Sequence, residues 1–217
     1  VFLITGFMLS GLLINHSAFA ADQDSAIGFV TNIKGSAYLI NNDQKTPIQV
    51  SQKIHSNDKV ATDNQSLLTI TFNDTSELTL PENSMLRIDE FIFNPHEATN
   101  NKAHLSVLKG GIKFISGLIS KKQKPAILIQ TQYGSLGLRG TKVWAAQIDD
   151  AYRIYVEDGI VDVKNQTSSV TVTHGEGTHI MVPPAGTDQI ASTRNFSAPK
   201  IWGDAMINRI KDMMLYK

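Results

Sequence analysis

Few residues in this chain have the types and spacing that catalysis or metal binding requires. The chain has six histidines, and His174 and His179 flank a carboxylate, Glu176. A turn at residues 175–177 could gather these three side chains into a metal site. Their odd spacing instead predicts opposite faces if they share one strand. We therefore interpret the histidines as surface residues near turns, and we expect no metal and no other cofactor.

Asp149-Asp150 and Glu157-Asp158 are carboxylate pairs adjacent in sequence. Acid–base catalysis needs carboxyl groups that face each other about 5 to 10 Å apart, whereas adjacent acids of this kind are typical of solvated turns. A Gly-x-Ser-x-Gly elbow, a P-loop and a dinucleotide Gly-x-Gly-x-x-Gly pattern are all missing from the sequence. These observations predict a protein that is not an enzyme.

The segment from Gly134 to Thr141 contains three regularly spaced glycines and one arginine, Arg139. Apolar strand-like runs lead into and out of it, and glycine inside such sequence indicates a bulge, a bend or a close backbone approach. No helix follows, so the glycines have no helix N-terminus with which to bind phosphate. We predict that Arg139 is partly buried and bonded to carbonyls or a carboxylate, with direct partner binding as the alternative.

The elements that position these residues are predicted to be strands. Short runs rich in Val, Ile, Thr, Phe and Tyr alternate with polar residues from residue 27 onward, broken by Gly, Asn, Asp and Pro. This pattern predicts an all-β fold of many short strands in a β-roll or solenoid-like stack, with a two-sheet sandwich as the alternative. We assign residues 27–182 to this β domain, 183–200 to an extended linker and 201–217 to a helix.

The C-terminal segment changes to helical periodicity. Trp202, Met206, Ile210 and Met213 recur at helical spacing with polar residues between them, which predicts a short amphipathic helix. Such a face can pack back on the β domain. It can also dock into a partner, because methionine-rich faces suit adaptable contacts.

The N-terminal residues predict export. Residues 1–20 form an uncharged apolar run that ends in Ala18-Phe-Ala20, which is typical of a signal peptide cleaved after Ala20; residues 21–26 then begin the mature chain. The protein is expected in the periplasm or secreted, without stable membrane insertion after cleavage. A net charge of +0 gives no support to nucleic-acid binding, and the lack of cysteine excludes disulfides. The oligomeric state is left open.

Several motifs occur in a recognisable order. They are Gly28-Phe-Val30 with Gly35, Asp58-Lys-Val-Ala-Thr62, Asn73-Asp-Thr-Ser76, Leu108-Lys-Gly-Gly111, Arg139-Gly-Thr141 and Val156-Glu-Asp-Gly-Ile-Val-Asp-Val163. Together they make residues 27 to 165 resemble the FecR-type periplasmic domain. The resemblance implies a structural family motif made of Asp58, Thr62, Asp74, Gly134, Gly137, Arg139, Gly140, Thr141 and Gly159. Asn57 and Thr75 stand where the pattern has glycine. Asn tolerates the left-handed conformation, whereas β-branched Thr75 predicts a different turn type.

The resemblance implies an interaction module in envelope signalling or scaffolding whose partner is another envelope protein. We do not extend to this chain the transmembrane relay of the regulators that give the family its name. The alternative is a module that binds a glycan or another envelope polymer, for which Tyr133, Trp144, Tyr152 and Tyr155 are the nearest aromatic candidates. A metal-dependent hydrolase is a more distant third hypothesis.

Overall fold

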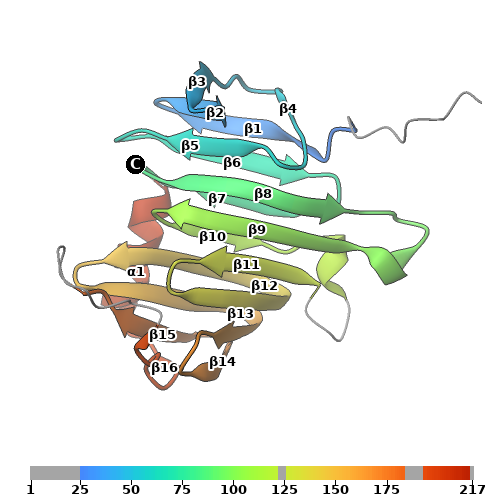
Figure 1. Cartoon of the computed structure of the whole chain (residues 1–217). Coiled ribbons are helices and arrows are strands. Elements are labelled where there is room, and N and C mark those ends of the chain that lie inside the picture. Colours follow the sequence, from blue (N-terminus) through green and yellow to red (C-terminus); the bar gives the residue numbers. More distant parts are fainter. Residues whose placement is uncertain (1–24, 122–125, 184–192, 216–217) are drawn as a thin grey trace, which may run out of the picture.

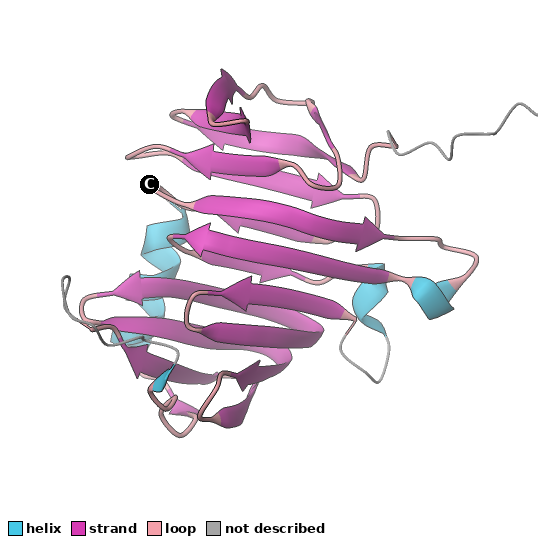
Figure 2. Cartoon of the chain, viewed as in Figure 1, coloured by secondary structure: helices cyan, strands magenta, loops and turns pink. Residues whose placement is uncertain are grey.

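The computed structural model describes residues 25–121, 126–183 and 193–215, and most of them lie in β-strands (Figures 1 and 2). The predicted signal peptide lies outside the described residues. The strands are β1 (Gly28–Lys34), β2 (Ala37–Asn41), β3 (Gln44–Pro47), β4 (Lys53–Ile54), β5 (Lys59–Thr62), β6 (Leu67–Phe72), β7 (Glu77–Leu80), β8 (Met85–Ile92), β9 (Lys102–Lys109), β10 (Ile112–Ile115), β11 (Ile127–Thr131), β12 (Gly134–Ile148), β13 (Ala151–Lys164), β14 (Ser169–Thr173), β15 (Glu176–Met181) and β16 (Lys200–Ile201). Two 3-10 turns, η1 (Ala98–Asn100) and η2 (Leu118–Lys121), and one helix, α1 (Asp204–Leu215), complete the described elements.

All strands belong to one sheet that curls over on itself (Figure 1). We call the run β3-β2-β5-β8-β9-β11 the front half and the run β10-β7-β6-β1-β4 the back half. Strand β12 joins them, because its residues 134–138 pair with β11 and its residues 142–145 pair with β10. This curled sheet of many strands and one short C-terminal helix confirms the all-β prediction.

The chain alternates between the halves as it advances, which gives the stack its solenoid-like character. Strand β9 lies in the front half, β10 lies in the back half, and the chain returns through η2 to β11. Because of this crossing, β11 runs parallel to β9, with Ile129 opposite Leu105. Most of the other pairings are antiparallel ladders between strands that follow closely along the chain, such as β6 with β7 and β8 with β9.

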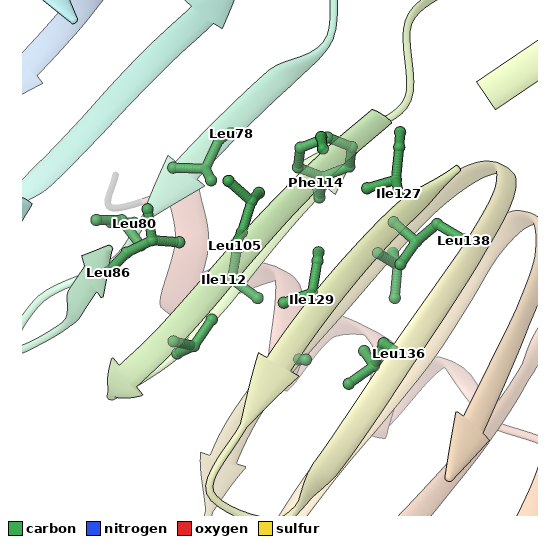
Figure 3. Packing of buried hydrophobic residues seen from close by; sticks show 14 of the residues in the cluster. Leu78, Leu80, Leu86, Leu105, Ile112, Phe114, Ile127, Ile129, Leu136 and Leu138 are labelled. Carbon is green, nitrogen blue, oxygen red and sulfur yellow. The ribbon is translucent and has the colours of Figure 1, made fainter. Parts of the chain in front are cut away.

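The space between the two halves is filled by one apolar cluster. Alternate residues of each strand point inward, as the period of two predicts, and Figure 3 shows leucines and isoleucines from neighbouring strands meeting there. Phe72 of the back half stacks on Phe91 of the front half, with ring centroids 4.6 Å apart. Burial of these side chains is the main stabilising contribution, at about 1.5–3 kcal/mol for each large one.

The passage from one half to the other occurs at a corner in β12 and β13. The register of this pair shifts between Arg139 and Lys142, which marks a β-bulge. Gly140 and Gly159 lie at this corner with φ of 59° and 84°, the left-handed region that favours glycine. A Cβ atom on Gly159 would overlap the carbonyl oxygen of Gly140, whereas a Cβ on Gly140 would meet no atom within 4 Å.

The bulged residue keeps its backbone hydrogen bonds through a neighbouring loop. Thr141 N–H donates to Ser116 Oγ at 3.1 Å, and Ser116 N–H donates to the Thr141 carbonyl at 2.8 Å. Since a bulge removes ladder bonds, these contacts satisfy buried groups that would otherwise cost free energy. Ser116 follows β10, so the corner is fastened to the adjoining strand of the back half.

The end of the curled sheet that carries β14 and β15, at the bottom of Figure 1, is contacted by part of the segment predicted to be a linker. Its described part, residues 193–200, packs on the sheet: Phe196 is buried in the core, and Ser197 N–H donates to the His179 carbonyl at 2.8 Å. The sequence interpretation as an extended linker did not anticipate this contact, because a single aromatic residue between polar ones has no periodicity to reveal it.

The corner glycines provide the first test of the fold. We expect Gly159→Ala to lower the free energy of unfolding by about 3 kcal/mol or more, since it adds a backbone overlap to a left-handed conformation. Gly140→Ala is the matched variant, and it should cost only about 1–2 kcal/mol because its Cβ has free space. Urea unfolding followed by circular dichroism measures both; equal losses would contradict the close approach at Gly159.

Candidate interaction surface

Arg139 lies on the outer face of the sheet, where it links three strands. Its Nη2 donates to Asp162 Oδ1 at 2.9 Å, and Thr171 Oγ1 donates to the same oxygen at 2.9 Å. The Arg139 side chain is 31% exposed, so solvent screens the pair and its contribution is about 1 kcal/mol or less. This arrangement ties β12, β13 and β14 together and places no reactive group beside the arginine.

The other glycines of the motif serve close packing. A Cβ on Gly134 would lie 2.6 Å from the carbonyl oxygen of Lys164, so only glycine fits where β12 begins. Gly137 is buried within β12, opposite Leu128 on β11 and Asp162 on β13. Neither glycine borders a phosphate-sized site at a helix N-terminus, which agrees with the structural interpretation of this segment.

Asp58 and Thr62 organise the turns on either side of β5. Asp58 Oδ2 accepts the N–H of His55 at 2.8 Å, which closes the turn before the strand. Thr62 is buried; its hydroxyl donates to the Pro81 carbonyl and accepts the N–H of Ser84 at 3.1 Å. Asn57, which precedes Asp58, has φ of 70°, so it takes the left-handed conformation that asparagine tolerates.

Asp74 is the most completely buried charged side chain of the motif, with no exposed surface. Its Oδ1 accepts the N–H of Ser76 at 2.9 Å and the Ser76 hydroxyl at 2.5 Å, while Oδ2 accepts the N–H of Ile119 at 3.2 Å. Asp74 therefore joins the β6–β7 turn to η2, far along the chain. Thr75 beside it has φ of 67°, so the prediction of a different turn type was wrong: the turn keeps the left-handed residue and accepts the strain of a β-branched one.

The histidines and carboxylates are dispersed. Nδ1 of His174 lies 3.7 Å from Asp158 Oδ1, Nδ1 of His179 lies 3.0 Å from Ser197 Oγ, and Glu176 Oε2 accepts the N–H of Thr173 at 2.8 Å. Burial lowers the pKa of His179, aided by Arg153 and Lys200. Within residues 25–121, 126–183 and 193–215, no three His, Asp or Glu side chains are grouped as a metal site.

The C-terminal helix packs on the outer face of β12 and β13. Trp202 and Ile210 are buried in a small cluster with Trp144 and Tyr155, and Met206 and Met213 pack against it. The ring of Trp202 sits directly over Gly177, where a Cβ would overlap it, and it stacks on Tyr155 with centroids 5.7 Å apart. In this arrangement Trp202 and Ile210 are interior residues rather than a free partner surface. Separately, no described helix is long and apolar enough to span a bilayer.

Glu157 fastens this helix through three donors. Lys211 Nζ and Trp144 Nε1 donate to it at 3.0 Å and 2.9 Å, and Lys142 Nζ lies 3.2 Å from its Oε2. Partial burial raises the pKa of Glu157, but the bonds from these three donors outweigh burial and hold the pKa below its usual value. Beside it, Arg209 Nη2 donates to Asp149 Oδ1 at 2.8 Å. Neither acidic pair is therefore arranged for acid–base work.

A groove of about 410 Å³ lies on the outer face of the back half, beside the end of α1. Thr69 and Thr79 occupy opposed positions on β6 and β7, with their hydroxyl oxygens 3.5 Å apart. Lys113 lies next to them, with its ammonium 3.7 Å from Glu77 Oε1 and 5.2 Å from the centre of the Trp144 ring. The groove thus offers hydroxyls and one ion pair to a polar ligand or peptide.

Sequence reasoning did not find this groove. Its lining residues come from β1, β6, β7, β10 and α1: Asn32, Ile33, Lys34, Leu67, Thr69, Glu77, Thr79, Lys113 and Met214. Thr, Lys and Glu occur at the outward-facing positions of many strands in this chain, so their presence in the sequence does not distinguish the groove from other outer surfaces. The groove could be predicted only from which strands pair and in which register, and the sequence alone does not give the pairing order.

The aromatic residues considered for a glycan site are all buried. Tyr133 and Tyr152 stack at 4.3 Å between centroids, and Trp144 and Tyr155 lie under α1. An exposed stacking platform on these four side chains is therefore not present.

Both the sequence and the fold of this chain are similar to those of known proteins. A family model described as "FecR protein" matches residues 58–162. Two crystal structures of a candidate anti-sigma factor from Parabacteroides distasonis share the fold: one is 13% and the other 10% identical, each with a TM-score of 0.50. Each similarity covers 69% of this chain and 62% of the other chain. No curated protein sequence matches this chain.

The buried carboxylate of Asp74 generates one prediction. We expect Asp74→Ala to lower the free energy of unfolding by about 2–4 kcal/mol, since it leaves buried donors of Ser76 and Ile119 without acceptors. Asp212→Ala, at an exposed position of α1, is the control and should stay within about 0.5 kcal/mol of the parent. Thermal and urea unfolding measure both, and a neutral Asp74→Ala would show that the turn does not depend on the carboxylate.

The packing of α1 on the sheet should depend on pH through the carboxylate of Glu157. Because the pKa of Glu157 is lowered in the folded chain, its contribution is complete above the unfolded-state pKa of about 4.3 and disappears as the pH falls through the folded value. We expect the fluorescence of Trp144 and Trp202 to report loosening of α1 below about pH 4. In Glu157→Gln this acid-dependent step should shrink to the part that comes from Asp149, whose pKa is lowered by its bond to Arg209 of α1. Glu97→Gln, in the η1 turn, should titrate like the parent. An unchanged step in Glu157→Gln would assign it to another group.

Proposed function

Because the chain carries a FecR domain over residues 58–162, we propose that it is an exported, non-enzymatic module that binds another envelope protein in signalling or scaffolding. The family match is the observation that carries this proposal. The two structures that share the fold are described as a candidate anti-sigma factor, which is consistent with signalling. Export rests on the signal-peptide pattern of residues 1–20.

The groove beside α1 is the surface best suited to a protein partner. Its base holds the hydroxyls of Thr69 and Thr79, which are suited to bond the backbone of a polypeptide segment. Lys113 is mostly shielded, with a 14% exposed side chain, so its charge is felt more strongly than that of a free surface lysine. Met214 of α1 borders the groove, but its side chain is fully buried in the cluster beneath the helix.

The groove further suits recognition because its ion pair can discriminate between partners. A bound segment that carries an acid near Lys113 and a base near Glu77 replaces one internal pair by two intermolecular ones. Segments of the opposite polarity are repelled at both positions. The proposed partner is therefore a protein segment with polar, mixed-charge side chains, rather than an apolar helix.

The proposal is tested by site-specific photo-crosslinking in cells. A photo-crosslinking amino acid placed at Asn32 or Glu77, at the groove, should capture an envelope protein, whereas the same amino acid at exposed Asn100 should not. Charge reversal by Glu77→Lys should reduce capture from Asn32 by about ten-fold.

Two results would overturn the proposal. One is equal capture from Asn100 and from the groove, which would indicate non-specific collision. The other is the absence of any envelope protein among the captured partners of the folded chain. Circular dichroism of each variant establishes that the fold persists, so that loss of capture reports on the groove.

A further inference from the structure

The curled sheet ends in strand edges that the chain protects unequally. Strand β3 carries Lys45 and ends at Pro47, two features that discourage pairing with another chain, and β4 is only two residues long. At the lower end, the free side of β15 is covered: Ser197 N–H donates to the His179 carbonyl, and β16 pairs with Glu176 and Gly177. Three of the edges are thus blunted or covered.

Strand β14 is the exception among the described residues. It pairs with β13 on one side, and no described strand pairs with its other side. Its sequence, Ser-Val-Thr-Val-Thr, contains no proline, glycine or charge and consists mostly of β-branched residues. An edge of this kind is a template for another strand.

The backbone groups that point outward from β14 can be identified. Thr173 N–H donates to the Glu176 carboxylate at 2.8 Å, so it points away from β13. At the other end, Asn165 N–H donates to the Ser168 carbonyl at 3.0 Å in the hairpin that joins β13 to β14. Because antiparallel ladders alternate, both contacts indicate that Ser169, Thr171 and Thr173 direct their N–H and C=O groups outward.

We propose that β14 pairs antiparallel with β14 of a second copy of this chain, with Thr171 opposite Thr171 across a two-fold axis. This register is self-complementary: Val170 meets Val172, and Ser169 meets Thr173. Each cross-strand pair therefore joins side chains of the same kind, and no charges are opposed within the strand pair. The pairing is isologous and closes as a dimer. It joins the sheets of the two copies into one continuous sheet, and it is independent of the groove proposed above.

The side chains of β14 favour the same register. Val172 is fully buried and Val170 packs on the edge of the core, so their inner face extends the apolar layer toward the second copy. On the outer face, Thr171 is held by its bond to Asp162, which itself is bound by Arg139. The strand is thus presented in a fixed conformation, which reduces the entropy lost on pairing.

Glu176 competes with the proposed partner at one end of the edge. Its carboxylate accepts both the N–H and the hydroxyl of Thr173 at 2.8 Å. The second copy's Ser169 must displace this carboxylate to bond Thr173. Displacing Glu176 breaks two hydrogen bonds, so the proposed pairing is weaker than it would be at a free edge.

Analytical ultracentrifugation of the purified protein over a concentration series tests the proposal. Thr171→Lys and Thr171→Glu should each raise the dimer dissociation constant at least about ten-fold, since like charges then face each other across the axis. An equimolar mixture of the two variants should restore a dimer, because opposite charges then meet. Glu176→Ala should tighten the dimer by freeing Thr173.

A matched substitution on another edge strand, β3, is the control for this experiment. Thr46→Lys makes the same substitution on β3, another edge strand, and should leave dimerisation unchanged. A parent protein that stays monomeric at all concentrations, or a dimer that tolerates Thr171→Lys, would overturn the proposal. Circular dichroism and thermal unfolding of each variant separate loss of pairing from loss of the fold.

Discussion

The fold depends on one close backbone approach, where Gly159 on β13 passes the carbonyl of Gly140 on β12. Here the longest strand pair of the molecule turns from the front half of the sheet to the back half. A Cβ on Gly159 would separate the strands and open the corner. The two halves could then no longer face each other at the spacing that lets Phe72 stack on Phe91. The apolar core exists because this corner closes.

Two sets of buried polar contacts, at Ser116 and at Asp74, support the corner from neighbouring loops. Ser116 satisfies the backbone of Thr141 at the bulge, and two residues later Leu118 N–H donates to the Asp74 carbonyl at 2.8 Å. Asp74 therefore positions the loop after β10, and Ser116 in that loop bonds Thr141 at the corner. This order explains why a buried carboxylate is tolerated: its acceptors match donors in two segments that lie far apart along the chain.

Much of this architecture could be predicted from sequence because it rests on local rules. Alternating apolar residues indicated the strands, the helical spacing of Met206, Ile210 and Met213 indicated α1, and the isolated arginine indicated a paired guanidinium. Trp202, which was assigned to the same helix, lies before it. The groove could not be predicted, because Thr69, Thr79 and Lys113 become neighbours only through the order of strands. Thr75 was misjudged for a different reason. Local preference disfavours its left-handed conformation, but the bonds of Asp74 to Ser76 in the turn and to Ile119 of η2 override that preference.

The positions of the motif residues explain why the match to the FecR family model is more informative about the fold than about the partner. Asp74, Thr62 and Thr141 are buried, and their polar atoms bond the chain's own backbone and side chains. The glycines act through the absence of a side chain. Arg139 and Asp58 are partly exposed, but Arg139 Nη2 is already bonded to Asp162 and Asp58 Oδ2 to the N–H of His55. A ligand has little access to any of these groups, so specificity must come from the outer faces and edges of the sheet. On those faces a side chain can change without disturbing the corner, and different partners can be accommodated on one interior.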